Sequence, residues 1–236
     1  MVGGPSPMAT GIPGSSPIGV EEIAAALGGY LVGAIPFALV VTRMRGIDLR
    51  EFGTGNPGAS NAYRNAGKLI GALILVLDVL KVLGPFLVLA LVMDRLLLAA
   101  IWGAACQVGH SWPVYLGFKG GKGVAVGGGM YIGYAIYLGT VGILLGILLG
   151  YGTGVANKRP GFATVVLLGI GPLYTWVVGA PPEIVAGGVA VIAIVILRRL
   201  FELPGAWQSY PNKPALIWSD VGEDMVPGAR TTGRRR

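Results

Sequence analysis

Long apolar stretches separated by short polar segments run through most of the 236-residue chain. A helix needs about 20 apolar residues, usually about 17–25, to cross the hydrocarbon core of a bilayer. Residues 23–42, 69–92 and 96–115 each fit one crossing. Of two later stretches, 124–156 is too long for one crossing and short for two, and 163–197 is divided by the turn sequence GAPPE. This pattern predicts an all-α integral membrane protein.

Positive charges between these stretches predict how often the chain crosses the membrane. They cluster in 43–68, at Lys119 and Lys122, at Lys158 and Arg159, and at Arg198 and Arg199. Cytoplasmic loops collect Lys and Arg, so an even number of crossings is expected between one cluster and the next. Two crossings per interval plus the first helix predict seven spans, with the N-terminus outside and the C-terminus cytoplasmic. Within 124–156, a pair of short tilted helices and a re-entrant element remain alternatives.

The composition agrees with a membrane protein and excludes several kinds of site. Only 12% of the residues are charged, against about 25% in soluble domains. Cys106 is the single cysteine and His110 the single histidine, which excludes an internal disulfide and a multi-histidine metal site. We expect no metal and no cofactor. Because the basic residues of this +7 chain flank its spans, no nucleic-acid partner is expected.

The chain divides into three predicted segments. Residues 1–20 lack both the basic residues and the continuous apolar core of a secretory signal, and are expected to form a disordered tail. Residues 21–201 are expected to form the seven-span membrane domain. Residues 202–236 are rich in Pro, Gly and Trp and end in three arginines, which predicts a basic cytoplasmic tail.

Two glycine-rich loops lie between the predicted spans, FGTGNPGASNAYR at 52–64 and GHSWPVYLGFKGGKGVAVGGG at 109–129. Glycine lets the backbone approach a ligand and take positive φ, so that successive N–H groups can form an anion-binding nest. Arg64, Lys119 and Lys122 add full positive charges suited to phosphate. The plainer alternative is that the glycines make turns and the lysines follow the positive-inside rule. The presence of two such loops favours phosphate recognition at the membrane surface.

The second loop is not a nucleotide-binding P-loop. That motif reads G-x-x-x-x-G-K-[ST], and here Lys122 is followed by Gly123 and Val124, so the hydroxyl that binds Mg²⁺ is missing. No strand is expected before the loop, and no plausible acidic partner follows it.

Both loops resemble the first two signature motifs of the bacterial acyl-phosphate:glycerol-3-phosphate acyltransferase family. YLVGAIPFALV at 30–40 and LDVLK at 77–81 are similar to the family too, and the resemblance covers roughly residues 25–200. It implies a seven-span acyltransferase-like domain in the bacterial inner membrane, with the active site on the cytoplasmic face. It also implies transfer of an acyl chain from acyl phosphate to the 1-hydroxyl of glycerol 3-phosphate. The products would be inorganic phosphate and lysophosphatidic acid for phospholipid synthesis, and membrane lipids would surround the protein.

The resemblance further implies a substrate site built from both loops. The first motif usually has a serine where this chain has Thr54. The implied substrate-binding residues are Thr54, Gly55, Asn56, Gly58, Asn61, Arg64, Lys119, Gly120, Gly121, Lys122 and Gly123, and the implied catalytic residue is His110.

The later family elements match less well. The third motif is a polar His-Arg-Glu-Asn run before an Arg-Leu pair, and in AIVILRRL at 193–200 only Arg198, Arg199 and Leu200 fit. In PGFATVV, which follows Arg159, Thr164 is the nearest hydroxyl to the serine that the family usually has. An alternative is therefore a catalytically degenerate paralogue that binds or transports phosphate-bearing ligands or lipid headgroups.

Acyl phosphate is already activated, so the glycerol hydroxyl can attack it directly without a protein nucleophile, and positioning by the loops contributes to the rate. His110 is then a general base, a positioning group or a structural group. Asp78 and Lys81 are three residues apart on the second expected span and share a helix face. Because charges inside a membrane are costly, we expect these two to form an ion pair that supports the site.

Overall fold

The computed structural model describes residues 18–52, 55–142, 145 and 160–209, with side chains in the last range described for 169–201. Its helical elements are α1 (Val20–Gly33), α2 (Phe37–Arg43), η1 (Leu49–Glu51), α3 (Ala59–Asn65), α4 (Lys68–Leu87), η2 (Val88–Val92), α5 (Leu96–Ser111), η3 (Val114–Leu116), α6 (Val124–Tyr137), α8 (Pro160–Val177) and α9 (Pro182–Ser209). Most of both predicted tails, and the basic pair Lys158 and Arg159, lie outside the described residues.

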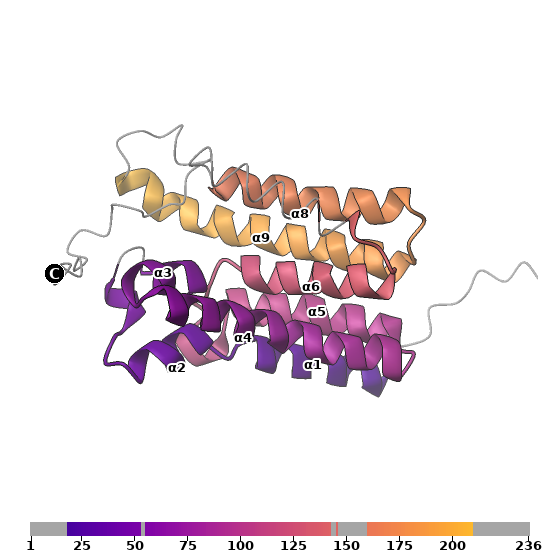
Figure 1. Ribbon diagram of the computed structural model, residues 1–236, viewed down its shortest axis with the longest axis horizontal. Helices are drawn as coiled ribbons and strands as arrows, with labels where there is room; N and C mark the ends of the chain where they lie inside the picture. Colours follow the sequence, from indigo (N-terminus) through magenta and orange to yellow (C-terminus); the bar gives the residue numbers. More distant parts are fainter. Residues whose placement is uncertain (1–17, 53–54, 143–144, 146–159, 210–236) are drawn as a thin grey trace, which may run out of the picture.

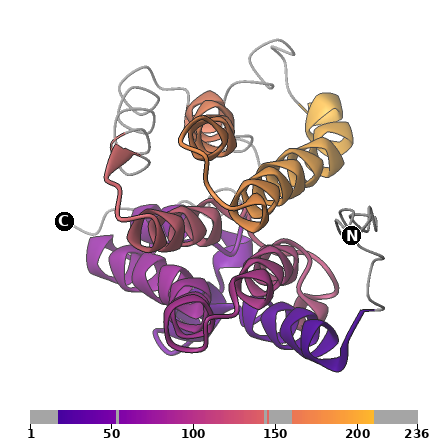
Figure 2. The ribbon, with the colours of Figure 1, turned by 90° about the vertical axis from the view of Figure 1, so that its right-hand side faces the viewer.

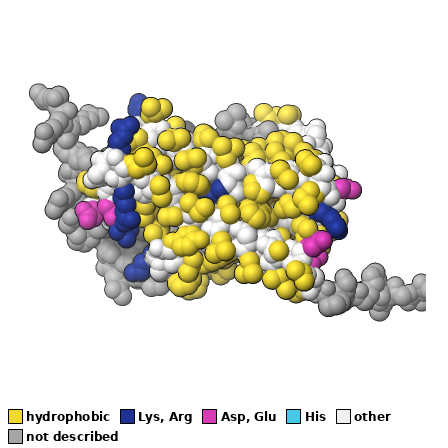
Figure 3. Space-filling model, turned by 90° about the horizontal axis from the view of Figure 1, so that it is seen from below, with side chains coloured by type: hydrophobic (Ala, Val, Ile, Leu, Met, Phe, Trp, Pro, Cys, Tyr) yellow, Lys and Arg dark blue, Asp and Glu magenta, His cyan; other side chains and the backbone are white. Residues whose placement is uncertain are grey.

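Three helical stretches in the described part are long and apolar enough to cross a membrane: Val20–Arg43, Lys68–Val92 and Pro182–Phe201. Figure 3 shows a broad hydrophobic band with Lys and Arg side chains gathered at the end that carries α2 and α3. A smaller group of charged side chains lies at the opposite end. This distribution is that of a protein surrounded by lipid, and it agrees with the predicted all-α membrane class. The count of seven spans and the orientation of the termini stay predictions.

The helices run alongside one another in a bundle. Helix α1 packs along α5, α4 packs on α6, and α9 lies against both α5 and α6 with α8 next to it (Figures 1 and 2). Phe86 of α4 and Tyr131 of α6 each meet Tyr134 edge to face, with ring centroids 5.5 and 5.8 Å apart. The Tyr131 hydroxyl donates to the carbonyl of Gly188 in α9 at 3.2 Å. These contacts hold α4, α6 and α9 in fixed relative positions.

Glycines allow α1 to lie directly on α5. A Cβ added to Gly33 would come within 2.2 Å of the Cys106 carbonyl oxygen, and one at Gly109 within 2.1 Å of the Tyr30 carbonyl oxygen. Small residues permit such close helix contacts in membranes. As a consequence, the end of α1 lies beside His110, which follows Gly109 in α5.

The first predicted span, 23–42, lies within one stretch long and apolar enough to cross a membrane, but that stretch is made of two helices. Helix α1 ends at Gly33 and α2 begins at Phe37. Pro36 has no N–H to donate and disfavours a helical conformation at Ile35, which explains the break. The carbonyl of Gly33 is left for a side-chain donor, whereas that of Ile35 accepts from the Phe37 N–H at 3.1 Å.

Candidate active site

The first glycine-rich loop is organised by Asn61. Its buried side-chain amide donates to three backbone carbonyls, those of Leu49 at 3.1 Å, Phe52 at 3.0 Å and Asn56 at 3.1 Å. Its Oδ1 accepts from the side chain of Asn65 at 2.8 Å. The predicted substrate residue Asn61 therefore has its hydrogen-bonding groups directed at the loop itself.

The other predicted residues of the first loop have different structural positions. Gly55 takes a φ of +67°, which favours glycine, and Gly58 is the N-cap of α3. Arg64 lies in the last turn of α3. Thr54 lies outside the described residues.

A group of ion pairs stabilises the segment of the chain that precedes the first loop. The Asp48 carboxylate accepts from Arg43 at 3.0 Å and from Arg50 at 2.6 Å. The hydrogen bonds from Arg50 hold the pKa of the Asp48 carboxyl well below its usual value, against the opposing effect of partial burial.

The second loop folds back onto the end of α5. The N–H of Gly121 donates to the His110 carbonyl at 3.0 Å, and the N–H of Gly120 donates to the Ser111 carbonyl at 3.3 Å. A Cβ at Gly121 would lie 2.2 Å from the His110 Nε2 atom, so a larger residue cannot occupy this position without displacement. The glycines thus bring the loop backbone against the imidazole.

At the far end of the second loop, Gly123 has a φ of +80° and forms the N-cap of α6. A Cβ there would lie 1.9 Å from the Nε2 of Gln107, which is fully buried in α5. Sequence reasoning missed Gln107, although a polar residue within an apolar span was the available signal.

Lys81 connects α4, α1 and α5 at the centre of the site. Its ammonium lies 2.8 Å from Asp78 Oδ1, 3.0 Å from the Gly33 carbonyl and 3.4 Å from the Ile35 carbonyl. Its remaining neighbour is His110 Nδ1 at 3.0 Å. The expected Asp78–Lys81 ion pair is present, and both side chains are buried. A protonated lysine can only donate, so Nδ1 must accept and the ring proton of neutral His110 belongs on Nε2.

These groups surround a small cavity at the broken helix. Its volume is about 10 Å³, near the minimum that holds one water. Its lining includes Ile35, Asp78 and His110 from the bundle, Pro57 from the first loop and Gly121 from the second. Both sequence motifs therefore meet at one place. The predicted cations Arg64, Lys119 and Lys122 do not line it.

Helix α9 holds the second loop from the other side. Arg198 Nη2 donates to the Gly120 carbonyl at 3.0 Å, and the Phe201 and Trp112 rings meet edge to face at 6.1 Å. Sequence reasoning singled out Arg198 as part of a basic cluster and as a surviving part of the third motif. Its contact with Gly120, across 78 positions of the chain, carries no signal in the sequence.

The family model for glycerol-3-phosphate acyltransferase matches residues 23–202 of this chain. The chain belongs to the glycerol-3-phosphate acyltransferase family. The Anaeromyxobacter sp. (strain K) glycerol-3-phosphate acyltransferase is 38% identical over 176 residues, covering 72% of this chain and 86% of the relative. The Agrobacterium fabrum enzyme is 38% identical over 180 residues, covering 72% and 80%. The family predicted from the two glycine-rich motifs is thus confirmed.

Two solved structures share the fold of this acyltransferase family member. One is the crystal structure of PlsY, an integral membrane glycerol 3-phosphate acyltransferase, in its glycerol 3-phosphate form. It is 28% identical with a TM-score of 0.67, covering 79% of this chain and 92% of PlsY. The other is the lysophosphatidic acid form, 26% identical with a TM-score of 0.66, covering 84% and 99%. The predicted class, an all-α membrane acyltransferase acting on glycerol 3-phosphate, is confirmed.

Proposed function

We propose that the protein transfers an acyl chain from acyl phosphate to the 1-hydroxyl of glycerol 3-phosphate, producing lysophosphatidic acid and inorganic phosphate. The observation that carries this proposal is the meeting of both motif loops and the broken first span around His110. Such a site offers the His110 imidazole and flanking cations to two phosphorylated substrates. The two forms of PlsY, with glycerol 3-phosphate and with lysophosphatidic acid, support the acceptor and the product.

The reaction needs no covalent enzyme intermediate. The 1-hydroxyl oxygen attacks the acyl carbon, an ester bond forms, and the bond from that carbon to the phosphate oxygen breaks. The hydroxyl proton leaves with the departing phosphate, which is basic enough to take it. The protein contributes by holding the two substrates close together and by offsetting negative charge on the oxyanion and the leaving phosphate.

Within this reaction we assign His110 a positioning role rather than that of a general base. Lys81 donates to Nδ1, which leaves Nε2 as the N–H donor on the side of the ring that faces Gly121. A base would need a free lone pair on that atom. As a donor, Nε2–H can bind a phosphate or acyl oxygen and fix it against the second loop.

The cations are assigned to phosphate recruitment at the rim. Lys119 is exposed on the second loop, Lys122 is partly buried, and Arg64 is exposed on α3. Since none of them lines the small cavity, they would bind a phosphate that extends outward from it. Thr54 is assigned to the same phosphate by its place in the motif alone.

Helix α9 supports an active enzyme despite its altered third motif. Arg198 still fixes Gly120, and Phe201 still packs on Trp112, so the second loop has structural support from the segment that lost its polar run. The alternative, a degenerate paralogue that only binds phosphate-bearing ligands, rests on the loss of the polar run that precedes Arg198 in the family motif.

We further place the site on the cytoplasmic side of a bacterial inner membrane. The support is the concentration of Lys and Arg at the α2–α3 end of the bundle.

A direct assay tests the function. The purified chain is supplied with palmitoyl phosphate and glycerol 3-phosphate, and both lysophosphatidic acid and phosphate are measured. The expected result is equal amounts of the two products, with none when glycerol replaces glycerol 3-phosphate. The Anaeromyxobacter relative serves as positive control. Binding of glycerol 3-phosphate without turnover, under conditions where that relative works, would support the degenerate alternative.

A further inference from the structure

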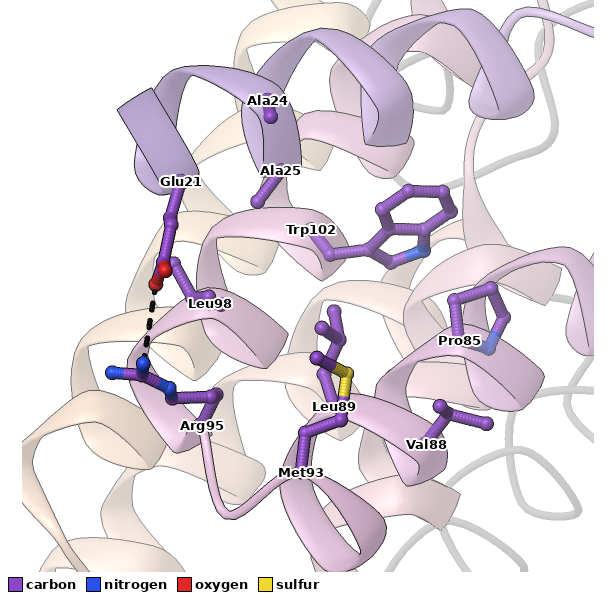
Figure 4. Close-up of a pocket in the computed structure, with 10 residues that line it drawn as sticks. All are labelled: Glu21, Ala24, Ala25, Pro85, Val88, Leu89, Met93, Arg95, Leu98 and Trp102. Carbon is purple, nitrogen blue, oxygen red and sulfur yellow. Dashed lines mark ion pairs between the residues drawn. The ribbon is translucent and has the colours of Figure 1, made fainter. Parts of the chain in front are cut away.

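A second cavity lies at the end of the bundle remote from the two loops. It has a volume of about 450 Å³, within the range of about 300–1,000 Å³ typical of ligand pockets. It opens between α1, the end of α4 with η2, and α5 (Figure 4). Its walls are mostly apolar, and its lining residues are Glu21, Ala24, Ala25, Pro85, Val88, Leu89, Met93, Arg95, Leu98 and Trp102.

The backbone of α4 changes where this cavity lies. Pro85 cannot donate a backbone hydrogen bond, and from Val88 to Val92 the helix takes the wider π form. Helix α1 packs closely on α5 but only lightly on α4. The resulting space borders the lipid-facing surface, because Leu97 and Val88 beside it are half exposed. Apolar walls without a neighbour lose dispersion contacts, which a lipid chain entering the cavity restores.

Three polar groups mark this cavity as more than an apolar crevice. Glu21 Oε2 and Arg95 Nη2 lie 3.5 Å apart at one end, and both side chains are more than half exposed. Trp102 lies at the other end, and its buried Nε1–H has no hydrogen-bond partner among the described residues. A donor buried without a partner is costly, so this N–H favours a ligand that brings an acceptor.

We propose that this cavity binds one zwitterionic glycerophospholipid of the phosphatidylethanolamine class. Its phosphate contacts Arg95, its ammonium contacts Glu21, and one ester carbonyl accepts from the Trp102 N–H. One acyl chain fills the apolar space beside Pro85 and Val88. An exposed ion pair is weak. Glu21 and Arg95 can therefore separate, and each can bind an opposite charge of the headgroup at little cost in free energy.

The polar groups decide between this ligand and the tail of the acyl donor. A tail that reached the cavity from the reaction site would arrive with its methyl end. It would bring no group for Arg95, Glu21 or the Trp102 N–H. A phospholipid in the leaflet opposite the two loops presents its phosphate and ammonium at the level of Arg95 and Glu21, and its ester carbonyls deeper, toward Trp102.

Lipid binding to the full chain tests the proposal. The protein is purified in detergent, stripped of lipid and titrated with palmitoyl-oleoyl phosphatidylethanolamine, and bound lipid is counted by native mass spectrometry. We expect one lipid per chain, bound about two- to fivefold more weakly by Arg95→Gln, because an exposed charge pair is worth at most about 1 kcal/mol. Ala24→Phe should weaken it similarly, since Ala24 is exposed and its new ring would fill the cavity.

Matched controls separate this site from general lipid adsorption. Arg45→Gln removes an exposed arginine at the other end, and Val76→Phe adds a ring to an exposed position of α4 outside the cavity. Both should bind like the wild type. The dialkyl-ether analogue lacks the ester carbonyls. It should bind to the wild type more weakly than the ester lipid does, whereas Trp102→Phe should bind the two lipids equally. That comparison holds even where a cavity variant folds poorly.

Three results would overturn the proposal. The first is binding that is the same in Arg95→Gln, Ala24→Phe and both controls. The second is phosphatidylglycerol binding as tightly as phosphatidylethanolamine, because an anionic headgroup has no ammonium for Glu21. The third is an Ala24→Phe protein that keeps phosphatidylethanolamine but prefers shorter acyl phosphates, which would assign the cavity to the donor tail.

Discussion

At the scale of single residues, Lys81 is the side chain on which most of the site depends. It contacts a carboxylate, two carbonyls of a broken helix and a ring nitrogen, all within 3.4 Å. Of these partners, the Asp78 carboxylate and the Gly33 carbonyl are buried, where a polar group without a partner is costly. The lysine therefore links the helix break in α1 to the orientation of His110 in α5.

Replacing one member of the buried pair should be more harmful than replacing both. Asp78→Asn leaves the Lys81 charge without its counter-ion, and such changes cost about 3–5 kcal/mol in buried pairs. We expect a clear loss of folded yield and of melting temperature in detergent. The double variant Asp78→Asn/Lys81→Met should regain part of that stability but not activity, since the contact with His110 is lost. Equal stability of Asp78→Asn and wild type would contradict the pairing.

The assigned role of His110 is tested by the pattern of two substitutions. His110→Ala removes the Nε2–H donor and should lower kcat/KM by about 10²–10³-fold, as removal of one oxyanion donor does. His110→Gln can place an N–H near the same position and should stay within about tenfold of wild type. A general base would lose activity equally in both, because an amide cannot accept the proton. The activity of the wild type and both variants is measured as phosphate release from palmitoyl phosphate.

At the scale of elements, helix α9 and the second loop act together. Arg198→Met should raise the KM for glycerol 3-phosphate, since a hydrogen bond to a charged group is worth about 1.5–3 kcal/mol, roughly 10–100-fold. Arg198→Lys keeps the charge and should restore part of the affinity. A matched apolar change, Leu197→Ala on the exposed face of α9, should leave the KM unchanged. An unaltered KM in Arg198→Met would contradict the proposal that α9 supports substrate binding by the second loop.

The stability of the segment before the first loop should be independent of pH above the ordinary pKa of Asp, because of the ion pairs of Asp48. Its pKa is lowered in the folded protein, so the stability it contributes is complete above the ordinary Asp value of about 3.9. That contribution is lost as the pH falls through the lower folded pKa. Hydrogen exchange of peptides covering 43–52 should show unchanged protection between about pH 7 and pH 5, corrected for intrinsic rates. Asp48→Asn should exchange faster than wild type throughout that range, and equal protection would contradict the ion-pair account.

The sequence identified elements better than it identified contacts between them. The glycine motifs led to the family because their composition is local and unusual. Pro36 carried a signal for the helix break, yet hydropathy over 23–42 hid it. The Lys81–His110 and Arg198–Gly120 contacts join positions 29 and 78 residues apart, and only the packed bundle brings them together. Asn61 illustrates the same limit, because its motif position suggested a ligand contact while its amide is hydrogen-bonded to the loop backbone.

At the scale of the whole molecule, charge and hydropathy give the bundle two unlike ends. One end carries the loops, the basic residues and the site with Lys81 and His110. The other carries the Glu21–Arg95 pair and the larger apolar cavity. The chemistry is thus placed at one membrane surface and the proposed phospholipid at the other, with α1, α4 and α5 running between them.

The predicted topology is open to a direct labelling test. Cys106 is buried, and its replacement by Ala gives a background without cysteine. Single cysteines are then introduced at Ile18 before α1, Tyr115 in the second loop and Pro182 at the start of α9. Seven spans with an outside N-terminus place Tyr115 in the cytoplasm and the other two outside. A membrane-impermeant maleimide added to intact cells should label Ile18→Cys and Pro182→Cys, and Tyr115→Cys only after the membrane is opened. Labelling of Tyr115→Cys in intact cells would reverse the orientation. Labelling of only one of Ile18→Cys and Pro182→Cys would instead show that an odd number of spans separates them. The predicted crossings within 124–156 would then be the first part of the count to revise.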